Sequence, residues 1–308
     1  MPPSSPLPVA PAAPTTTAPV ERDLVTGYDA AARPAVVHHT TGQVLLTPGA
    51  DVAYVLGAER WCIGYRTPAG DTGPGPDAAR AAVGAACASC ATATMLQPCI
   101  TRCTGARCVN AARRRSCVPV AHYVYLAYYA DDVIKVGVTK RERFAARITE
   151  QGALAAVAIH AAGGQDVRAL ETRVRTAGYV DRTDVVPLLC TPHPAPAHME
   201  DVLRETAARV AVRMPDVPWM SRGPMVTCTP HYPAPLLVPP RVLDAAHDPL
   251  CGTVLGVRGG HVLLQLPASV PGAARGVGVL SLRSLLGRTI APASGESLCG
   301  PGQLALWG

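Results

Sequence analysis

Lysine is almost absent from this 308-residue chain: the sequence holds only Lys135 and Lys140, and all its other long basic side chains are arginine. Ala, Arg, Pro, Gly and Val dominate the composition, as expected of a bias that replaces lysine with arginine wherever either residue will serve. Two lysines that persist close together under such a bias are therefore candidates for a role that arginine does not fill.

Long apolar runs and an amino-terminal signal are also missing. The longest nearly apolar run, ALAAVAIHAA, is about half the length needed to span a bilayer. The first nineteen residues contain seven prolines, no basic residue and no unbroken apolar run, which argues against a secretory signal and predicts a disordered tail. The sequence therefore predicts a soluble, cytoplasmic protein with no membrane partner.

A strong net charge is missing too. Lys and Arg number 28 against 22 Asp and Glu, which gives a net charge of +6. This balance permits a polyanionic partner but is too small for a protein that coats DNA. With 48% apolar residues, the chain can bury a substantial core and is long enough for two or three modules.

Cysteine, in contrast, is plentiful, with eleven in all. In a reducing compartment an odd number of cysteines favours metal ligation over a disulfide framework. Six of them lie in one segment with the pattern Cys87-x2-Cys90-x8-Cys99-x3-Cys103-x4-Cys108-x8-Cys117. A CxxC turn presents two thiolates to one ion, and the small residues between these cysteines supply little core of their own. We therefore expect a structural Zn²⁺ ion.

Turn residues and apolar periodicity divide the chain into segments. The expected order is a Pro/Ala/Thr-rich tail (1–22), a β-rich segment with a linker (23–85), a cysteine-rich zinc module (86–120), a core (121–215) and a second β-rich segment (216–308). Strands are expected within 35–65, hairpins at 252–266 and 276–290, and a helical region from about 140 to 213. The predicted fold class is α+β, and no sequence feature fixes whether the two β-rich segments pack together.

The stretch from HYVYLAYY to VIKVGV predicts a compact antiparallel hairpin, because both runs are rich in β-forming residues and the turn ADD separates them. Thr139 and Glu142 then have the spacing of a capping box, which predicts a helix from Lys140. On that helix Arg143 and Arg147 are four residues apart and share a face.

A second helix is expected near 166–177, ending before Gly178. Its apolar residues define a packed face, and Glu171 falls on that face. A carboxylate in such a place needs a positive partner, which is either a metal ion or an arginine such as Arg175, four residues later.

The order of these features resembles the GIY-YIG nuclease superfamily, whose fold is a small antiparallel sheet with helices. The resemblance implies hydrolysis of phosphodiester bonds in DNA or RNA with one Mg²⁺ or Mn²⁺ ion. It places Tyr123 and Tyr125 in the first tyrosine motif, where one tyrosine helps to activate water, and Lys135 at the start of the second motif. By the same resemblance Arg147 would hold the scissile phosphate, and Glu171 would hold the metal ion.

Four further residues would contact the substrate by this resemblance: Gly137, Thr139, Lys140 and Arg143. Gly137 would let the backbone approach the substrate. Lys135 stands where the superfamily usually has a tyrosine, so it would act as a base only with a lowered pKa and would otherwise bind phosphate as a point charge.

A wider arrangement looks like an uncharacterised bacterial domain family with a GIY-YIG-like core, from roughly Arg60 to Arg288. Its motifs in this chain are CxxC, TGARCVNAARRRSC, HYVYLAYY, KVGVT, RITEQGA, ALETRV, VDRTD and GTVLGVRGGHVLL. The zinc ligands that match this pattern are Cys87, Cys90, Cys108 and Cys117, with Cys103 in reserve.

Two alternatives to a nuclease stay open on the sequence. One is a non-catalytic nucleic-acid-binding protein on the same fold. The other is a pocket redirected to another enzymatic reaction, for example in specialised metabolism. The individual residues also have structural interpretations: the tyrosines as strand aromatics, and Arg147 as an ion-pair partner of Glu150 or Glu171.

Overall fold

The fold is known from a computed structural model, which describes residues 22–66, 72–76, 79–82, 84–94, 115, 117–180, 183–228, 232, 235–267 and 276–293. These residues form mainly antiparallel sheets and separate helices, so the predicted α+β class is confirmed. All but the last residue of the predicted tail lies outside the described residues. Within the described part of the chain, no helix is both long and apolar enough to cross a membrane.

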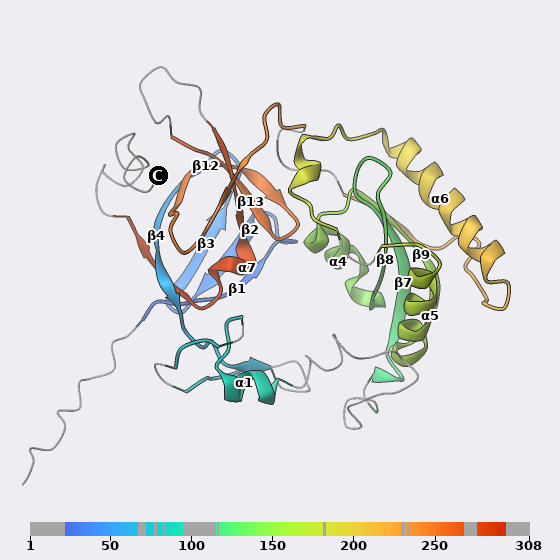
Figure 1. The fold of residues 1–308 in the computed structure, drawn as a ribbon, viewed down its shortest axis with the longest axis horizontal. Coiled ribbons are helices and arrows are strands. Elements are labelled where there is room, and N and C mark those ends of the chain that lie inside the picture. Colours follow the sequence, from blue (N-terminus) through green and yellow to red (C-terminus); the bar gives the residue numbers. More distant parts are fainter. Residues whose placement is uncertain are drawn as a thin grey trace, which may run out of the picture.

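Strands from both parts of the chain build one β module (Figure 1). One sheet has the strand order β1-β2-β3 and the other β11-β14-β13-β12-β4-β15. Because β4 pairs with both β12 and β15, the two predicted β-rich segments share a sheet. The elements are β1 (Val25–Asp29), β2 (Ala35–His39), β3 (Gly42–Leu46), β4 (Asp51–Arg60), β11 (Arg241–Leu243), β12 (Leu250–Arg258), β13 (His261–Gln265), β14 (Val277–Ser281), α7 (Leu282–Leu285) and β15 (Arg288–Pro292).

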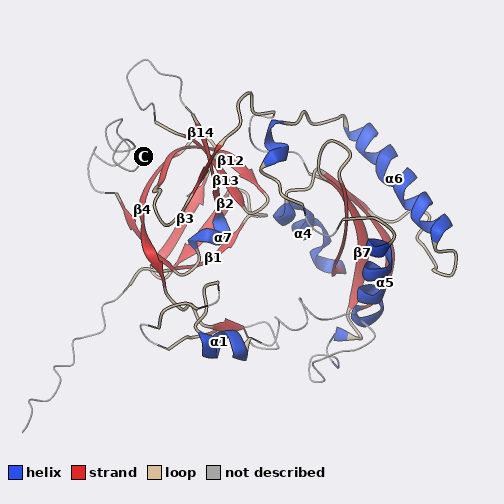
Figure 2. Cartoon of the chain, viewed as in Figure 1, coloured by secondary structure: helices blue, strands red, loops and turns tan. Residues whose placement is uncertain are grey.

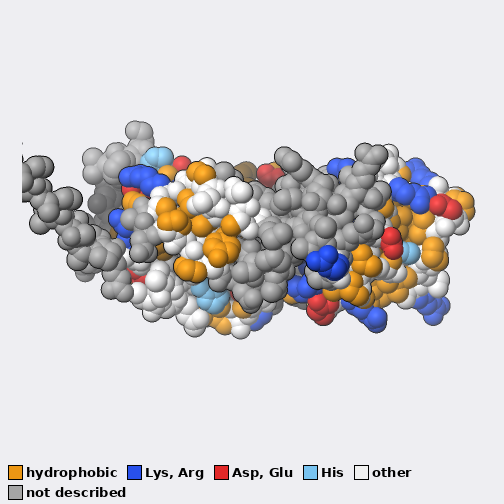
Figure 3. All heavy atoms as spheres, turned by 90° about the horizontal axis from the view of Figure 1, so that it is seen from below, with side chains coloured by type: hydrophobic (Ala, Val, Ile, Leu, Met, Phe, Trp, Pro, Cys, Tyr) orange, Lys and Arg blue, Asp and Glu red, His pale blue; other side chains and the backbone are white. Residues whose placement is uncertain are grey.

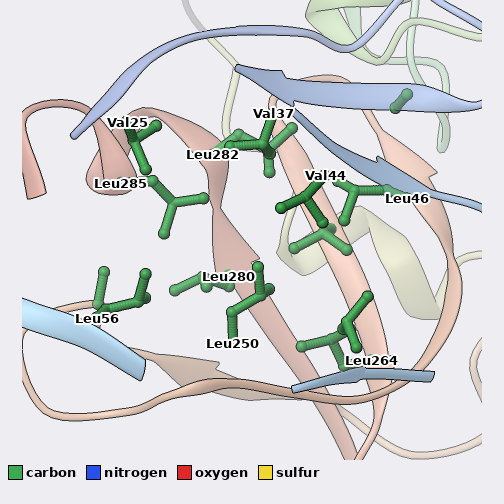
Figure 4. Packing of buried hydrophobic residues seen from close by; sticks show 14 of the residues in the cluster. Val25, Val37, Val44, Leu46, Leu56, Leu250, Leu264, Leu280, Leu282 and Leu285 are labelled. Carbon is green, nitrogen blue, oxygen red and sulfur yellow. The ribbon is translucent and has the colours of Figure 1, made fainter. Parts of the chain in front are cut away.

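An aliphatic core lies between these sheets (Figure 4). Val25, Val37 and Leu46 of the smaller sheet belong to the same buried cluster as Leu250 and Leu264 of the larger one. In β2 and β3 the buried residues alternate with more exposed ones, because successive side chains of a strand point to opposite faces. Burial of each such side chain contributes about 1.5–3 kcal/mol, so apolar packing holds the sheets together.

Of the two predicted carboxyl-terminal hairpins, one is confirmed and one is wrong. β12 and β13 pair antiparallel around a turn at Gly259, whose φ of 59° is left-handed. The hairpin expected at 276–290 does not form, because β14 pairs with β13 while β15 crosses to β4. Leu282 and Leu285, three residues apart and both fully buried, turn into the core as the short helix α7.

A second sheet forms the core module, with the strand order β10-β9-β7-β8 and only antiparallel pairs. The predicted hairpin is its β7–β8 pair, in which Tyr125 lies opposite Gly137. The elements are β7 (Ala121–Tyr128), β8 (Ile134–Lys140), η1 (Arg141–Arg143), α4 (Phe144–Gln151), β9 (Ala155–Gly163), α5 (Gly164–Thr176), η2 (Pro187–Cys190), α6 (Pro196–Arg213) and β10 (Met225–Thr227).

The two faces of this sheet have different coverings (Figures 1 and 2). Val124, Leu126 and Val136 pack in a cluster with residues of α5 and α6 on the outer face. Tyr123, Tyr125 and their neighbours pack with α4 and with residues of the β module on the inner face. The predicted catalytic tyrosines therefore lie on the face that looks toward the β module.

Two local predictions for this module are wrong. The region from about 140 to 213 is not helical throughout, because the run Ala155–Gly163 is the strand β9. Its first five residues are buried between the helices on both faces, so the run lacks the polar face of a surface helix. No side-chain capping bond forms around Lys140, and Thr139 is buried in β8 while a 3₁₀ turn leads into α4.

Arg258, at the end of β12, joins the β module to the core module. Its side chain is buried, and its Nε and Nη2 donate to the carbonyl oxygens of Gly152 and Tyr129 at 3.0 and 2.8 Å. Its Nη1 donates to the Tyr232 hydroxyl at 2.9 Å and to the Leu188 carbonyl at 3.1 Å. These hydrogen bonds offset the cost of burying the guanidinium charge.

The described part of the cysteine segment lies below the β module, around α1 (Figure 1). It contains α1 (Ala88–Ala93), and the preceding linker adds the short strands β5 (Tyr65–Arg66) and β6 (Thr72–Gly73). The amide of Ile63 donates to the carbonyl of Ala85 at 3.0 Å, which holds the segment against the end of β4.

Candidate metal and phosphate sites

Three thiols meet in the cysteine segment. The Sγ atoms of Cys62, Cys87 and Cys90 all lie within 4.8 Å of one another. Cys87 and Cys90 are buried, and Cys62 is partly buried. Such a group could hold a metal ion, because three convergent thiolates leave one ligand position of a tetrahedron to be filled.

Cys62 is the member of this group that the sequence interpretation missed, since it stands apart from the six clustered cysteines. The backbone around it has the form of a tight turn: the amide of Gly64, which has a φ of 95°, donates to the Cys62 Sγ at 3.4 Å. A β-carbon at Gly75 would come within 2.7 Å of the same sulfur. Gly64, two residues after Cys62, was thus the local signal, whereas Gly75 approaches the sulfur only through the fold.

The thiols of the CxxC turn differ in their ease of ionisation. Hydrogen bonds from the Ser89 hydroxyl and the Cys90 amide lower the pKa of Cys87 to about 6. Burial raises the pKa of Cys90 to about 12, and the neighbouring Cys62 and Cys87 thiols raise it as well. A cation among the three sulfurs would favour the thiolate of each.

The other predicted zinc ligands lie elsewhere. Cys103 and Cys108 fall outside the described residues. Cys117 lies at the entry to β7, where a β-carbon at Gly164 would come within 2.2 Å of its Sγ, and it is not among the three grouped thiols. Its ligation of zinc stays a prediction. Cys251, in β12, is disulfide-bonded.

On the inner face of the core sheet, three donors converge on one side chain, Gln151 at the end of α4. Its Oε1 accepts hydrogen bonds from the hydroxyls of Tyr125 and Tyr129 at 3.0 and 3.3 Å, and from the Lys135 Nζ at 3.2 Å. The left-handed Gly152, with a φ of 75°, ends the helix and fixes this position. Gln151 was not singled out in the sequence, because glutamine at a helix end is common.

Tyr125 is the centre of the predicted catalytic group. Its side chain is fully buried, and burial raises its pKa to about 12. The Arg147 charge lowers this pKa, and the Glu171 charge raises it. Gln151 links Lys135 of β8 to Tyr125 of β7 by hydrogen bonds, and Arg147 comes from α4 on the same inner face. Glu171 comes from α5, which covers the outer face, and it affects Tyr125 by its charge alone.

A neutral Tyr125 donates a hydrogen bond at neutral pH and does not serve there as a general base. Gly137 lies directly opposite it, and a β-carbon at Gly137 would come within 2.4 Å of the Tyr125 hydroxyl oxygen. The glycine of the second motif thus makes room for the tyrosine of the first.

Arg147 and Glu171 also take part in ion pairs. Arg147 lies 3.7 Å from Glu150, which also pairs with Arg143. Glu171 pairs with Arg168 at 2.8 Å, and its side chain is 19% exposed. Because Arg168 already occupies this carboxylate, a metal ion there would have to compete with it.

The remaining predicted residues lie at the start of the same hairpin. Tyr123 pairs with Thr139, and its ring meets the Phe144 ring edge-on at 5.5 Å. Lys140 is 52% exposed and lies 3.9 Å from Glu142. Tyr123 therefore has the contacts of a core aromatic, while Lys140 is open to solvent.

Comparison with known proteins assigns this region to a family but not to an activity. The model of a family described as protein of unknown function (DUF2797) matches residues 77–265. No curated protein and no solved structure matches the chain.

Proposed function

The chain belongs to the DUF2797 family, and from its core module we propose that it is a GIY-YIG-like nuclease that hydrolyses phosphodiester bonds in DNA or RNA. The observation that supports this most is the hydrogen-bonded link of Lys135 to the Tyr125 hydroxyl through Gln151, with the Arg147 charge acting on the same phenol. Cationic groups placed beside a buried donor are suited to a phosphate that gains negative charge in the transition state.

In this proposal each residue of the chain has a distinct part. Arg147, half-exposed at the surface of α4, holds the scissile phosphate. Lys135, which is partly exposed, binds the phosphate oxygens and orients the attacking water, while the buried Tyr125 hydroxyl holds Gln151, which in turn holds Lys135. A divalent ion would supply a Lewis acid for the leaving oxygen.

Glu171 is the residue that would hold Mg²⁺ or Mn²⁺. Mg²⁺ is often bound by one or two carboxylates together with waters and substrate phosphates, so a single carboxylate fits. Arg168 must then release Glu171 when the ion binds.

Cleavage of single- and double-stranded DNA and RNA, with and without Mg²⁺ or Mn²⁺, tests the proposal. Glu171→Gln should lower the cleavage rate by about 100-fold or more. Glu200→Gln is the matched control, because it breaks an exposed ion pair with Arg204 on α6 and should leave cleavage unchanged. Equal rates for the wild type and Glu171→Gln would refute the assignment.

The Arg168–Glu171 pair favours a second candidate, a nucleic-acid-binding protein without hydrolysis. A carboxylate that stays neutralised by an arginine has no need of a metal ion. Salt-sensitive binding with no cleavage, also in a Lys135→Tyr variant that restores the usual motif tyrosine, would support this candidate.

We propose further that the Cys62, Cys87 and Cys90 group holds a structural zinc ion. The short α1, with the sequence ASCATA, has no large apolar side chain, so a metal would stabilise a helix that packing alone holds weakly. The fourth ligand would come from a part of the chain outside the described residues or from water.

A further inference from the structure

A cleft of about 850 Å³ lies between the β module, the cysteine segment and α4. Its lining includes four arginines: Arg60 and Arg283 from the β module, and Arg143 and Arg147 from η1 and α4. Among its described lining residues Glu150 alone is acidic. Both walls of the cleft are therefore positively charged.

We infer that this cleft binds a single-stranded segment of nucleic acid, with the arginines of both walls on its phosphates and Tyr28 and Tyr65 on its bases. Such a strand is the substrate class of the proposed nuclease, and in that respect the inference rests on the proposed function. The binding itself requires no cleavage.

The Arg60 guanidinium at the wall of the cleft is only partly paired within the protein. Its Nη2 donates to the Ser284 carbonyl at 3.0 Å, whereas its Nε is buried and has no hydrogen-bond partner among the described residues. Native proteins leave few such buried donors unpaired. Arg288 lies nearby: burial lowers its pKa, and the positive charge of Arg60 lowers it further. An anion at this wall would relieve that repulsion.

The opposite wall connects the cleft to the proposed reactive group. The side chains of Arg143 and Arg147 are 56% and 46% exposed, so their guanidinium groups remain open on the side away from Glu150. The charge of Arg147 also lowers the pKa of the Tyr125 hydroxyl. A strand whose phosphates follow the two walls would therefore pass the proposed reactive group.

The size and lining of the cleft favour one strand over two. Its volume lies within the range of about 300–1,000 Å³ typical of pockets for small ligands, which leaves space for a few nucleotides and not for a duplex. Tyr28 of β1 and Tyr65 of β5 line it, and both are partly exposed. Basic groups alternating with aromatic rings are the usual lining of a single-strand path, because bases stack on aromatic faces.

The outer surface offers no comparable alternative on the face that Figure 3 shows. There the described Lys and Arg side chains form small separate groups, with hydrophobic side chains between them. A nucleic acid on the described part of this face would meet no continuous basic strip.

Fluorescence anisotropy with a labelled mixed-sequence strand, against the duplex of the same sequence and with EDTA present, tests the inference. We expect tighter binding of the strand than of the duplex. Arg60→Gln with Arg283→Gln should weaken strand binding about tenfold or more and reduce the slope of log K against log salt by about 0.7 for each phosphate that no longer meets an arginine. Tyr28→Ala with Tyr65→Ala should weaken binding about 30-fold or more without changing that slope.

Arg204→Gln with Arg209→Gln, on the exposed face of α6, is the control and should bind as wild type does. Should the double variant unfold, Arg283→Gln alone, at an exposed position, still tests whether loss of a cleft arginine weakens strand binding.

Unchanged binding in Arg283→Gln, or tighter binding of the duplex, would overturn the inference. Loss of binding in the cleft variants of a protein that never cleaves would support the inference and refute the nuclease. Cleavage that the cleft variants leave unchanged would support the nuclease and refute the inference about the cleft.

Discussion

Gly137 shows how one residue type links the two motifs of the core hairpin. A β-carbon there would lie 2.4 Å from the Tyr125 hydroxyl oxygen and 2.5 Å from its Cζ. The ring cannot yield easily, because Tyr125 is fully buried and its hydroxyl is tied to Gln151. The requirement for glycine at this position is therefore steric, whatever the substrate.

Gly137→Ala should lower the free energy of unfolding by about 1–3 kcal/mol, the usual range for overpacking a buried site. Urea denaturation would measure the change. Gly276→Ala is the matched control, because a β-carbon there meets nothing within 4 Å, and it should have the stability of the wild type. Similar stability for both variants would show that the Tyr125 ring moves freely.

Single residues also mark the limit of what the sequence could predict about the sites. The CxxC turn at Cys87 and Cys90 was predictable, because the spacing alone places both sulfurs on one side. Cys62 was not, because it reaches them only through the fold of β4 and its following turn. Gln151 was missed because glutamine at a helix end is common, and its donors reach it only through the fold: Tyr125 from β7, Tyr129 from just after β7 and Lys135 from β8.

At the scale of elements, the loop between η2 and α6 contains a histidine whose charge opposes folding. Burial lowers the pKa of His193 to about 4, and the Arg258 charge lowers it further. Its Nε2 lies 3.1 Å from the Tyr232 hydroxyl and 3.5 Å from the Arg258 Nη1. The neutral imidazole fits this place, and the protonated one would face a buried guanidinium.

Because the folded pKa of His193 is below the unfolded value of 6.5, the unfolded chain takes up its proton first as the pH falls. The stability that His193 contributes is present above about pH 6.5 and is lost as the pH falls toward 4. Urea unfolding across this window should show the loss, and His193→Asn should flatten it. His38→Gln, at an exposed position, should keep the slope of the wild type.

The elements themselves were predictable where one pattern dominated. Alternation located the strands between residues 35 and 65, and two long β-forming runs located the β7–β8 hairpin. β9 was mistaken for part of a helical region, because an alanine-rich apolar run has no polar face from which the period can be read. The pairing of β4 with β12 and β15 was unpredictable, since the sequence does not encode which distant strands meet.

For the whole molecule, a proposed zinc ion should be measurable as a component of the purified protein. We expect about one zinc ion per chain by elemental analysis. Cys62→Ser should lose most of it, because Cys62 supplies one of the three grouped thiols. Cys190→Ser, at a partly buried cysteine outside the group, should retain it. Removal of the ion by a chelator should lower the melting temperature of the wild type alone.

The junction of β4 with β12 also affects the order of events during synthesis. The Thr253 hydroxyl donates to the carboxylate of Asp51, a residue 202 positions earlier. While the ribosome makes the intervening chain, β4 has an open edge that awaits its partners, and such edges pair readily with other chains. The core sheet uses only strands from residues 121 to 227 and can close first. Pairing of strands so far apart in the sequence is slow. The nascent chain should therefore depend on slow synthesis or on a chaperone that shields the open edge of β4.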